Sequence, residues 1–208
     1  MKTLLLIILV ITNLSLYGQV KKPLQHKHDG FYGRATLGFG STSISESVDL
    51  TTGKMTIDMS GLSGDVNIHL GYSVIENLQL YGALGGNVLP NPKYEVNGKE
   101  ATTTTSSNVY LLRYGAGASY YFMPYNISVS FDLSAAKNQI ETNNVTANSD
   151  WGVIFNFGAG KEWWVSKDWG IGAMLYFYTG TVNDVTIGTQ TPKIDNTGFG
   201  ISFSATYN

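Results

Sequence analysis

The sequence contains no cysteine among its 208 residues. It therefore has neither a disulfide framework nor a cysteine that could carry a lipid anchor at a processed N-terminus. Charged residues are also scarce, at 13% of the chain, which is about half the usual share in a soluble globular protein. The chain must gain its stability by means other than disulfides, and its composition is unusual for a domain surrounded by water.

Long apolar runs are missing too, except at the start of the chain. Lys2 is followed by an apolar run from Leu4 to Ile11, then by polar residues and the small Gly18. This layout predicts a secretory signal peptide over residues 1–18, because its apolar core is too short to span a bilayer as a helix. No later run is long enough for a transmembrane helix, so any membrane crossing must use β-strands.

The charge balance excludes one class of partner. Without Lys2 of the signal peptide, 12 of the 13 cationic residues remain against 15 acidic ones, a net charge of about −3. Nucleic-acid binding requires a basic surface. We therefore predict no nucleic-acid partner.

Glycine and tyrosine are abundant, with 24 and 13 copies, and they occur in segments that alternate between apolar and polar residues. In the first segment Phe31, Leu37 and Phe39 share one face of a strand, and Arg34 and Thr36 share the other. The same split recurs, which predicts eight strands near residues 31–40, 65–74, 78–88, 110–122, 127–136, 151–163, 171–177 and 199–207.

The connections between these strands alternate in length. Long polar segments at 41–61, 89–107, 137–150 and 180–196 alternate with tight turns at 75–77, 123–126 and 166–168. All four long loops therefore lie at one end. Two of them, with Thr52-Gly53 and Asn97-Gly98, have the composition of hairpins that continue beyond the strands. We divide the chain into the signal peptide, a polar periplasmic leader over residues 19–29, and one barrel over residues 30–208.

Eight antiparallel strands can close an up-and-down barrel with either face outward. A soluble lipocalin-like barrel would turn its apolar face inward, whereas a transmembrane barrel turns it toward lipid and has short turns at one end and longer loops at the other. The loop lengths favour the transmembrane barrel. Trp163 and Trp169 flank a tight turn, and Trp151 lies twelve residues earlier on the same face, roughly 30 Å away along the barrel axis. We expect these tryptophans and Tyr207 at the membrane interfaces, with Lys161 reaching toward water.

With this pattern the chain resembles the small eight-stranded outer-membrane β-barrels of the OmpA transmembrane domain and OmpX type, over about residues 30–208. The last strand, from Asn196 to Phe203, is similar to the assembly signal of such barrels, but here the chain continues to Tyr207 and Asn208. The resemblance implies the outer membrane of a Gram-negative cell, with lipid and the barrel-assembly machinery as partners. It implies no single activity.

Six ionisable residues fall on the inward face of the predicted barrel. Counted from the periplasmic end, Arg34 and Glu162 lie low, His69 and Asp132 near the middle, and Asp65 and Arg113 high. This order suggests oppositely charged pairs in tiers. Either the pairs form a structural core, since buried charges need partners, or they line a narrow water path. Eight strands leave an interior that side chains can fill, which argues against a wide pore.

Catalytic and metal sites have little support. A barrel enzyme would need a base near its external rim, and none of the four long loops contains a histidine, so we predict no catalytic residue. His26, His28 and Asp29 could contact a metal, but two imidazoles in a solvated leader rarely suffice. The segment from Gly158 to Trp163 lacks the first glycine and the final Ser or Thr of a phosphate-binding loop. We therefore expect no metal and no cofactor.

The sequence thus predicts a monomeric outer-membrane barrel with a structural or surface-interaction role carried by its four external loops. The threonine-rich stretch from Thr102 to Thr105 and the hairpin tips suit contact with an extracellular partner. A narrow channel for small solutes is the alternative function, and a lipid-directed enzyme is a third hypothesis.

Overall fold

A computed structural model describes residues 27–50, 53–101, 106–123, 125–143, 145–185 and 191–208. The predicted signal peptide, most of the predicted leader and the stretch from Thr102 to Thr105 lie outside the described residues. The strands are β1 (Phe31–Leu50), β2 (Gly53–Ile75), β3 (Leu78–Pro90), β4 (Lys93–Val96), β5 (Lys99–Ala101), β6 (Ser107–Phe122), β7 (Ile127–Thr142), β8 (Val145–Asn148), β9 (Gly152–Trp164), β10 (Trp169–Asn183) and β11 (Lys193–Tyr207). Within the described part of the chain, no helix is long and apolar enough to cross a membrane.

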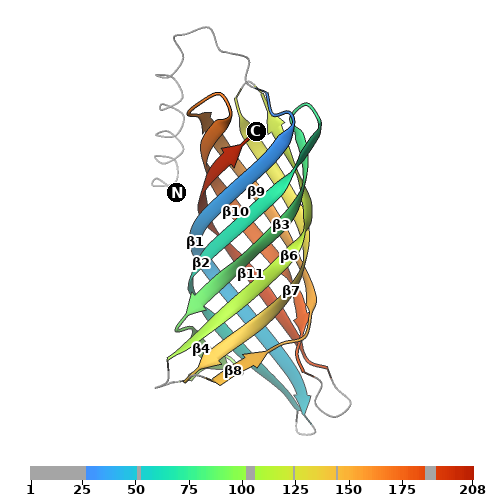
Figure 1. Ribbon diagram of the computed structural model, residues 1–208. Coiled ribbons are helices and arrows are strands. Elements are labelled where there is room, and N and C mark those ends of the chain that lie inside the picture. The colour runs from blue at the N-terminus through green and yellow to red at the C-terminus, as the bar shows by residue number, and fades with distance from the viewer. Residues whose placement is uncertain (1–26, 51–52, 102–105, 124, 144, 186–190) are drawn as a thin grey trace.

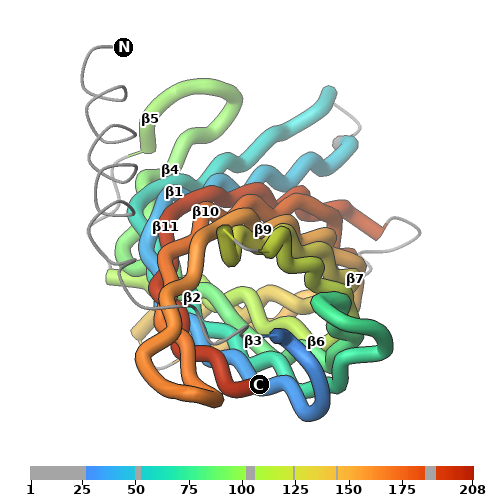
Figure 2. The backbone as a smooth tube through the Cα atoms, turned by 90° about the horizontal axis from the view of Figure 1, so that it is seen from above, coloured from blue at the N-terminus to red at the C-terminus, as the bar shows by residue number. Residues whose placement is uncertain are grey.

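Eight of these strands form a closed ring. The pairing runs β1-β2-β3-β6-β7-β9-β10-β11, every neighbouring pair is antiparallel, and β11 pairs back with β1. Figure 2 shows the ring from above. The register of the closing pair runs from Gly33 opposite Tyr207 to Ser47 opposite Lys193. The prediction of an eight-stranded antiparallel up-and-down barrel is therefore confirmed, and the eight strands include the eight predicted segments except Trp151, which directly precedes β9.

The connections at one end of the barrel are short. A two-residue turn joins β2 to β3, and Asn77 takes a positive φ of 67° there. Two further turns, after Phe122 and after Trp164, also span only a few residues. The start of β1 and the end of β11 lie at this same end, which is uppermost in Figure 1. Since short turns mark the periplasmic side of such barrels, we call this the periplasmic end.

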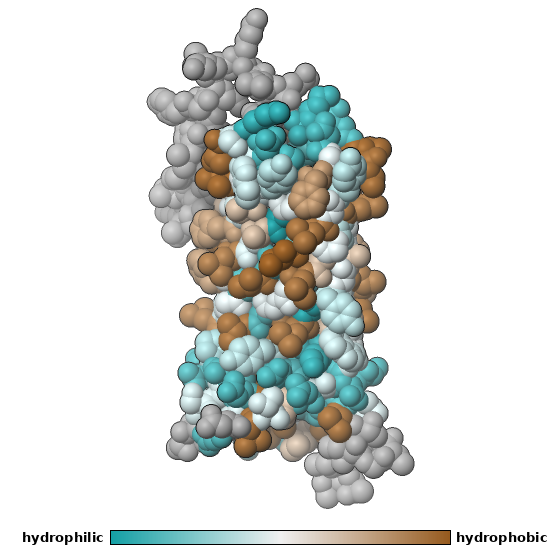
Figure 3. Space-filling model, in the orientation of Figure 1, coloured by the Kyte–Doolittle hydropathy of each residue, from teal (hydrophilic) through white to brown (hydrophobic). Residues whose placement is uncertain are grey.

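A belt of apolar side chains surrounds the outside of the ring. On β1 the outward residues from Phe31 to Phe39 are apolar apart from Gly33, and from Ser41 onward they are polar; Leu37 and Phe39 are 66% and 60% exposed. The other strands change in the same way, for example between Phe199 and Thr197 on β11. Figure 3 shows brown apolar residues concentrated across the middle of the barrel and teal polar residues toward the ends.

This belt faces lipid. Eight to ten residues per strand, at about 3.3 Å each and a tilt near 40°, give a belt of roughly 20–25 Å, the height of the apolar band in outer-membrane barrels. Such an area of exposed large apolar side chains would not be stable in water. The protein is an integral barrel of the outer membrane.

The four predicted external loops are largely ordered strand. β1 and β2 continue as one hairpin to Leu50 and Gly53, and β2 has 23 residues, roughly 55–60 Å along the barrel axis at the same rise and tilt. β4 and β5 form a second hairpin that pairs with the external part of β2, and β8 extends β7. Asn97 and Gly98 join β4 to β5 with φ values of 51° and 72°, as the Asn-Gly pair predicted. We call the part that lies beyond the apolar belt on the external side, at the bottom of Figure 1, the external extension.

The extension inverts the alternation found in the membrane. Its outward residues, such as Ser43 and Asp195, are polar, and its inward residues, such as Ile44 and Ile194, are apolar and buried. The sequence analysis described all four segments as long polar connections and expected hairpins in two of them. The β1–β2 and β4–β5 hairpins confirm that expectation. The structure adds that the outward polar residues belong to strands whose inward apolar residues form an interior of their own.

Candidate functional site: the barrel interior and its two ends

All six predicted interior residues face inward and are buried, each with a relative exposure of 8% or less. They come from five different strands, namely Arg34 on β1, Asp65 and His69 on β2, Arg113 on β6, Asp132 on β7 and Glu162 on β9. The ring brings them together although they are up to 128 positions apart. How they are paired determines what the interior can do.

The pair nearest the periplasmic end joins Arg34 to Glu162. The Arg34 Nη2 atom lies 2.7 Å from Glu162 Oε1. The same carboxylate oxygen accepts hydrogen bonds from the Tyr121 hydroxyl at 3.1 Å and the Thr206 hydroxyl at 2.8 Å. Arg34 also donates to Tyr121 and lies over the Tyr32 ring, with 5.6 Å between its Cζ atom and the ring centre. Each charged group therefore has several polar partners in a buried site, as a buried ion pair requires.

A second ion pair lies nearer the external end. Arg113 Nη2 is 2.5 Å from Asp65 Oδ2, and it also donates to Asn67 Oδ1 at 3.1 Å. The other guanidinium nitrogen donates to the Asn156 side chain. The guanidinium lies over the Tyr178 ring, with 5.0 Å to the ring centre, a favourable cation–π position. The pair is held by residues of four different strands.

His69 and Asp132, which the sequence analysis placed at the same height, do not form a direct ion pair. The His69 ring stacks on Tyr81 with 4.4 Å between ring centres. Asp132 Oδ1 instead accepts from Asn156 at 2.7 Å and from Ser134 at 3.0 Å. Both residues line one internal cavity of about 40 Å³, room for on the order of three waters. The expectation of charge pairs in tiers holds for two tiers and is wrong for the third.

On the external side of this cavity, an apolar core fills the interior of the external extension. The residues of this core come from all eight ring strands: Ile44, Met59, Leu89, Val109, Leu111, Ala136, Ile154, Tyr178, Val182 and Ile194. Each is at most 5% exposed. Water is excluded where such side chains are packed together. The sequence analysis missed this core, although the two-residue spacing of apolar residues in the predicted loops could have revealed it.

Tyrosines account for the space that inward glycines leave. A Cβ atom placed on Gly198 would lie 2.4 Å from the Tyr178 ring, and one on Gly200 would lie 2.6 Å from the Tyr176 hydroxyl. At these two positions a tyrosine side chain occupies the space beside the glycine, so the glycine does not widen the bore. On the periplasmic side of the cavity, a second buried cluster consists of Tyr32, Tyr81 and Tyr121, with exposures of 0–4%.

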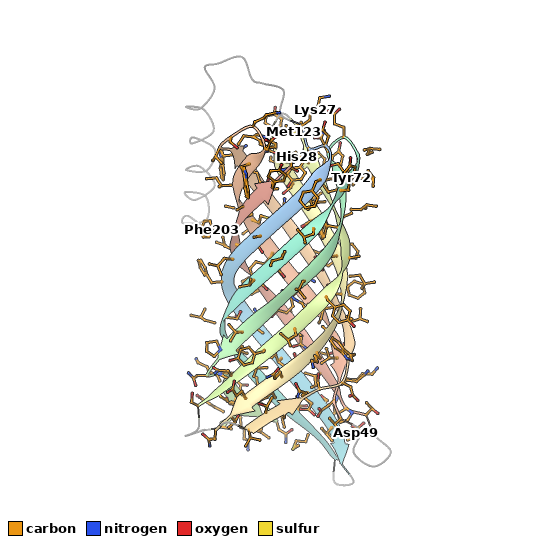
Figure 4. All side chains as sticks on the ribbon, viewed as in Figure 1. Lys27, His28, Asp49, Tyr72, Met123 and Phe203 are labelled. Atoms are coloured by element: carbon orange, nitrogen blue, oxygen red, sulfur yellow. The ribbon has the colours of Figure 1, made fainter. Side chains whose placement is uncertain are left out.

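Residues before β1 close the periplasmic end. His28 has no exposed surface, and its ring stacks on Tyr121 with 3.5 Å between ring centres and an angle of 17°. Its two ring nitrogens lie 2.8 Å from the side-chain oxygens of Asn208 and Asn126. Figure 4 shows His28 at the end of the barrel where Met123 also lies. The prediction of a solvated leader is wrong for His28, because the barrel end offers it an aromatic surface and two amides.

The four predicted interface aromatics lie on the outward face. Trp169 and Tyr207 contact each other edge to face at 5.4 Å, and Phe31 lies 6.1 Å from Tyr207. Lys161 lies over the Trp163 ring at 5.7 Å. At the opposite edge of the belt, Lys137 lies 5.4 Å from the centre of the Trp151 ring. Each set combines an aromatic ring with a nearby cation or second ring, as at membrane interfaces.

Among the described residues, no three or more His, Cys, Asp or Glu side chains are arranged to hold a metal ion. His26 lies outside the described residues, and the Asp29 side chain is exposed. The segment from Gly158 to Trp163 lies within β9, so it is a strand and not a phosphate-binding loop.

Comparisons with known proteins yield structures of outer-membrane proteins at low identity. No family model matches the chain, and no curated protein matches it. The outer membrane protease OmpT from Escherichia coli shares 10% identity, with 89% of this chain and 99% of that chain covered and a TM-score of 0.49. OprG from Pseudomonas aeruginosa shares 13%, covering 87% and 98%, with a TM-score of 0.45. Ail of Yersinia pestis shares 12%, covering 85% and 99%, with a TM-score of 0.40.

Proposed function

We propose that this protein is an outer-membrane barrel that presents a rigid polar surface for contact with molecules outside the cell. The observation that carries the proposal is the apolar core inside the external extension. A solute pathway needs an open or openable bore, whereas a binding platform needs strands held in fixed positions. A packed core in this part of the barrel serves the second requirement.

The extension offers suitable surfaces. The β1–β2 hairpin, the β4–β5 hairpin and β8 all project beyond the lipid-facing belt. Their outward side chains are mostly hydroxyl-bearing or charged, with a few exposed apolar residues such as Val96 and Val145, which are 37% and 69% exposed. Polar surfaces with isolated apolar residues are typical of non-obligate protein contacts. We propose that the extension binds an extracellular macromolecule. We further propose that the protein is a monomer, and that its barrel wall contacts membrane lipid and the barrel-assembly machinery.

Site-specific photo-crosslinking on living cells tests this role. A photoreactive amino acid at Val96 or Val145 is expected to yield a discrete adduct with an external macromolecule. The same amino acid at Lys167, in a periplasmic turn, is the matched control and should not yield that adduct. Replacing residues 93–101, the β4–β5 hairpin, by a two-residue turn tests whether this hairpin makes the contact. If it does, the photoreactive amino acid at Val145 should no longer yield the adduct. The proposal fails if neither external position gives an adduct in cells that display the protein.

A narrow channel is the second candidate function, favoured by the polar cavity at mid-height and the Asp65–Arg113 pair beside it. Single-channel current across a planar bilayer that contains the refolded chain from Gln19 distinguishes the two. We expect silence from the inserted wild type and from Arg113→Ala, because the apolar core closes the bore on the external side of the pair. Discrete openings that change with Arg113→Ala would favour the channel over the platform.

A further inference from the structure

Lys137, Trp151 and Tyr114 lie together on the outer wall of the barrel, at the external edge of the apolar belt. Lys137 is an outward residue of β7, and Trp151 directly precedes β9, which pairs with β7. The Lys137 Nζ atom lies 5.4 Å from the centre of the Trp151 ring. Tyr114 of β6 contacts the same ring edge to face, with 5.1 Å between ring centres. We call these three residues the external edge cluster.

The cluster lies where the outer wall changes from apolar to polar. Along the outward face of β7, Leu133 and Ala135 precede Lys137, and Gln139 and Glu141 follow it toward the external end. A side chain at this boundary meets the headgroups of the outer leaflet. Lys137 is partly buried, as expected for a lysine whose aliphatic stem lies along the wall while its amine reaches the headgroups.

The combination of a cation with aromatic rings is confined to one side of the barrel. On three other strands the first polar outward residues at this edge are Thr179 on β10, Thr197 on β11 and Ser41 on β1. These positions carry a small hydroxyl-bearing side chain and neither a ring nor a cation. An aromatic girdle that only fixed the barrel in the membrane would continue around the edge. The external edge cluster therefore indicates one preferred lipid position on the wall formed by β6, β7 and β9.

The Lys137 amine has no anionic partner in the protein. Within the described part of the chain, none of the ion pairs includes Lys137. Glu141 and Asp150 are the acidic residues nearest to the cluster in the sequence, and neither lies within ion-pair distance of the amine. The positive charge is therefore available to an anionic group of a lipid.

Lys161 at the periplasmic edge provides an internal comparison. Its Nζ atom lies 5.7 Å from the centre of the Trp163 ring, so the contact between cation and indole is nearly the same as in the external edge cluster. The Lys161 amine, however, also donates a hydrogen bond to the Tyr125 carbonyl. The periplasmic lysine has an acceptor from its own chain, whereas the external lysine relies on its surroundings.

The wall on the membrane side of the cluster offers apolar surface for acyl chains. Ala135 faces Tyr114 on β6 and Val153 on β9 in direct register. Tyr114, Val153 and the next outward residue of β7, Leu133, are 46–53% exposed. A lipid whose headgroup lies at the cluster would place its acyl chains against these side chains.

We propose that the external edge cluster binds a phosphorylated glycolipid of the outer leaflet, with a phosphate on Lys137 and a sugar ring against Trp151. Such a glycolipid is the main component of the outer leaflet of a Gram-negative outer membrane. The phosphate accepts a charge-assisted hydrogen bond from the amine, and the C–H groups of a sugar pack against the apolar face of an indole. The inference rests on the lipid contact of the barrel wall proposed above and does not depend on the extracellular partner.

Native mass spectrometry of the mature chain from Gln19, refolded in detergent micelles and titrated with lipid A, tests this site. The wild type should retain lipid A, and Lys137→Gln should bind it about tenfold more weakly, because a charge-assisted hydrogen bond is lost. Lys161→Gln is the matched control, since it removes the lysine of the other cation–indole contact, and it should bind like the wild type. Equal retention by the wild type and Lys137→Gln would overturn the proposal.

Two further lipids identify the part of the ligand that is recognised. Lipid A without its phosphates should bind the wild type about tenfold more weakly than intact lipid A. Phosphatidylglycerol, which has a phosphate and acyl chains but no sugar rings, should also bind more weakly. Equal retention of phosphatidylglycerol would show a general contact with anionic lipid, and equal retention of the dephosphorylated glycolipid would show that Lys137 binds no phosphate. Either result would overturn the proposal.

Two other variants keep the test decisive if Lys137→Gln does not fold. Lys137→Arg keeps the charge and should retain lipid A. Trp151→Leu keeps an apolar side chain but removes the ring, so its retention of lipid A should fall toward that of phosphatidylglycerol. Circular dichroism reports the folded barrel in each sample. Loss of binding in folded Lys137→Arg, or full binding in folded Trp151→Leu, would contradict the site, while the photo-crosslinking result at Val96 and Val145 would be unaffected.

Discussion

Arg34 and Glu162 show how much a single buried side chain can matter in this barrel. Both are almost completely buried, and their charges are 2.7 Å apart. Removing one partner leaves the other charge without compensation, which costs far more than losing the pair as a whole. The same logic applies to Asp65 and Arg113, and it makes these residues sensitive to single substitutions whatever the barrel binds.

A double-mutant cycle measures this coupling. Glu162→Gln should lower the free energy of unfolding by about 3–5 kcal/mol, because Arg34 stays buried and charged. Arg34→Met combined with Glu162→Gln should lose clearly less than the sum of the two single changes. Urea unfolding of the protein in lipid vesicles gives these values. Lys27→Met, which breaks an exposed ion pair, is the control with little expected change, and additive single effects at Arg34 and Glu162 would refute the coupling.

Glu46 provides a pH dependence outside the membrane. It lies on the inner side of β1 in the external extension, where burial and the neighbouring Asp184 carboxyl raise its pKa to about 7. A raised carboxyl pKa contributes stability at low pH, and this contribution is lost as the pH rises from 4.5 through about 7. The difference in stability between wild type and Glu46→Gln should therefore change across this range, measured by urea unfolding at pH 5 and pH 8.

Asp184→Asn is the control for this effect. It removes one of the causes of the raised pKa but leaves Glu46 able to ionise, so the pH dependence should become weaker without vanishing. Burial lowers the pKa of His28 from its ordinary value, and comparison of each variant with the wild type cancels the contribution of His28. A pH-independent difference between wild type and Glu46→Gln would contradict the shifted pKa.

At the scale of elements, the external hairpins place like charges side by side. Asp58 on β2 faces Glu95 on β4, and Glu95 faces Glu100 on β5, in direct register. Facing carboxylates on adjacent strands repel one another and weaken the pairing. The β4–β5 hairpin is therefore held on β2 less firmly than its backbone pairing alone would allow.

Changing the middle charge should strengthen this part of the sheet. Glu95→Lys is expected to slow hydrogen exchange of the β4 and β5 amides, a gain of roughly 0.2–1 kcal/mol that shrinks at high salt. The matched control is Glu141→Lys on β7, whose facing residues are Asn108 and Thr146 and carry no charge. Equal effects of the two substitutions, or faster exchange in Glu95→Lys, would argue against repulsion along this row.

For the whole molecule, the position of the lipid boundary determines which surfaces meet water. Phe203 lies on the outside of β11 within the apolar belt and is 59% exposed. Thr197 lies on the same face of the same strand, six residues nearer the external end. The two positions share a strand and an orientation and differ in depth.

Arginine at each position tests the boundary. Phe203→Arg should lower the free energy of unfolding in lipid vesicles by roughly 2–4 kcal/mol, and Thr197→Arg by only about 0–1 kcal/mol, because the cost of a lipid-facing arginine depends on depth. Equal costs would mean that the belt is not the membrane-spanning part. This measurement places the external extension relative to the bilayer without reference to any partner.

Local patterns in the sequence determined most of the barrel wall. Period-two alternation, as in Phe31 to Phe39, predicted the lipid face, because neighbouring residues of a strand point to opposite sides. The Asn97-Gly98 pair predicted a hairpin turn, because both residues accept a positive φ. The alternation of long and short connections predicted which end faces the periplasm. These features depend only on residues close together in the chain.

Only the tertiary structure decided what fills the barrel and closes its ends. Whether Ile44 and Ile194 point into a core depends on ring closure between β1 and β11, and the separation of His69 from Asp132 depends on the stagger of their strands. His28 is buried because Tyr121, Asn126 and Asn208 meet it from positions 93 to 180 residues later. A sequence specifies which face of a strand is apolar, but contacts across the bore depend on register, and register is set by the closed sheet as a whole.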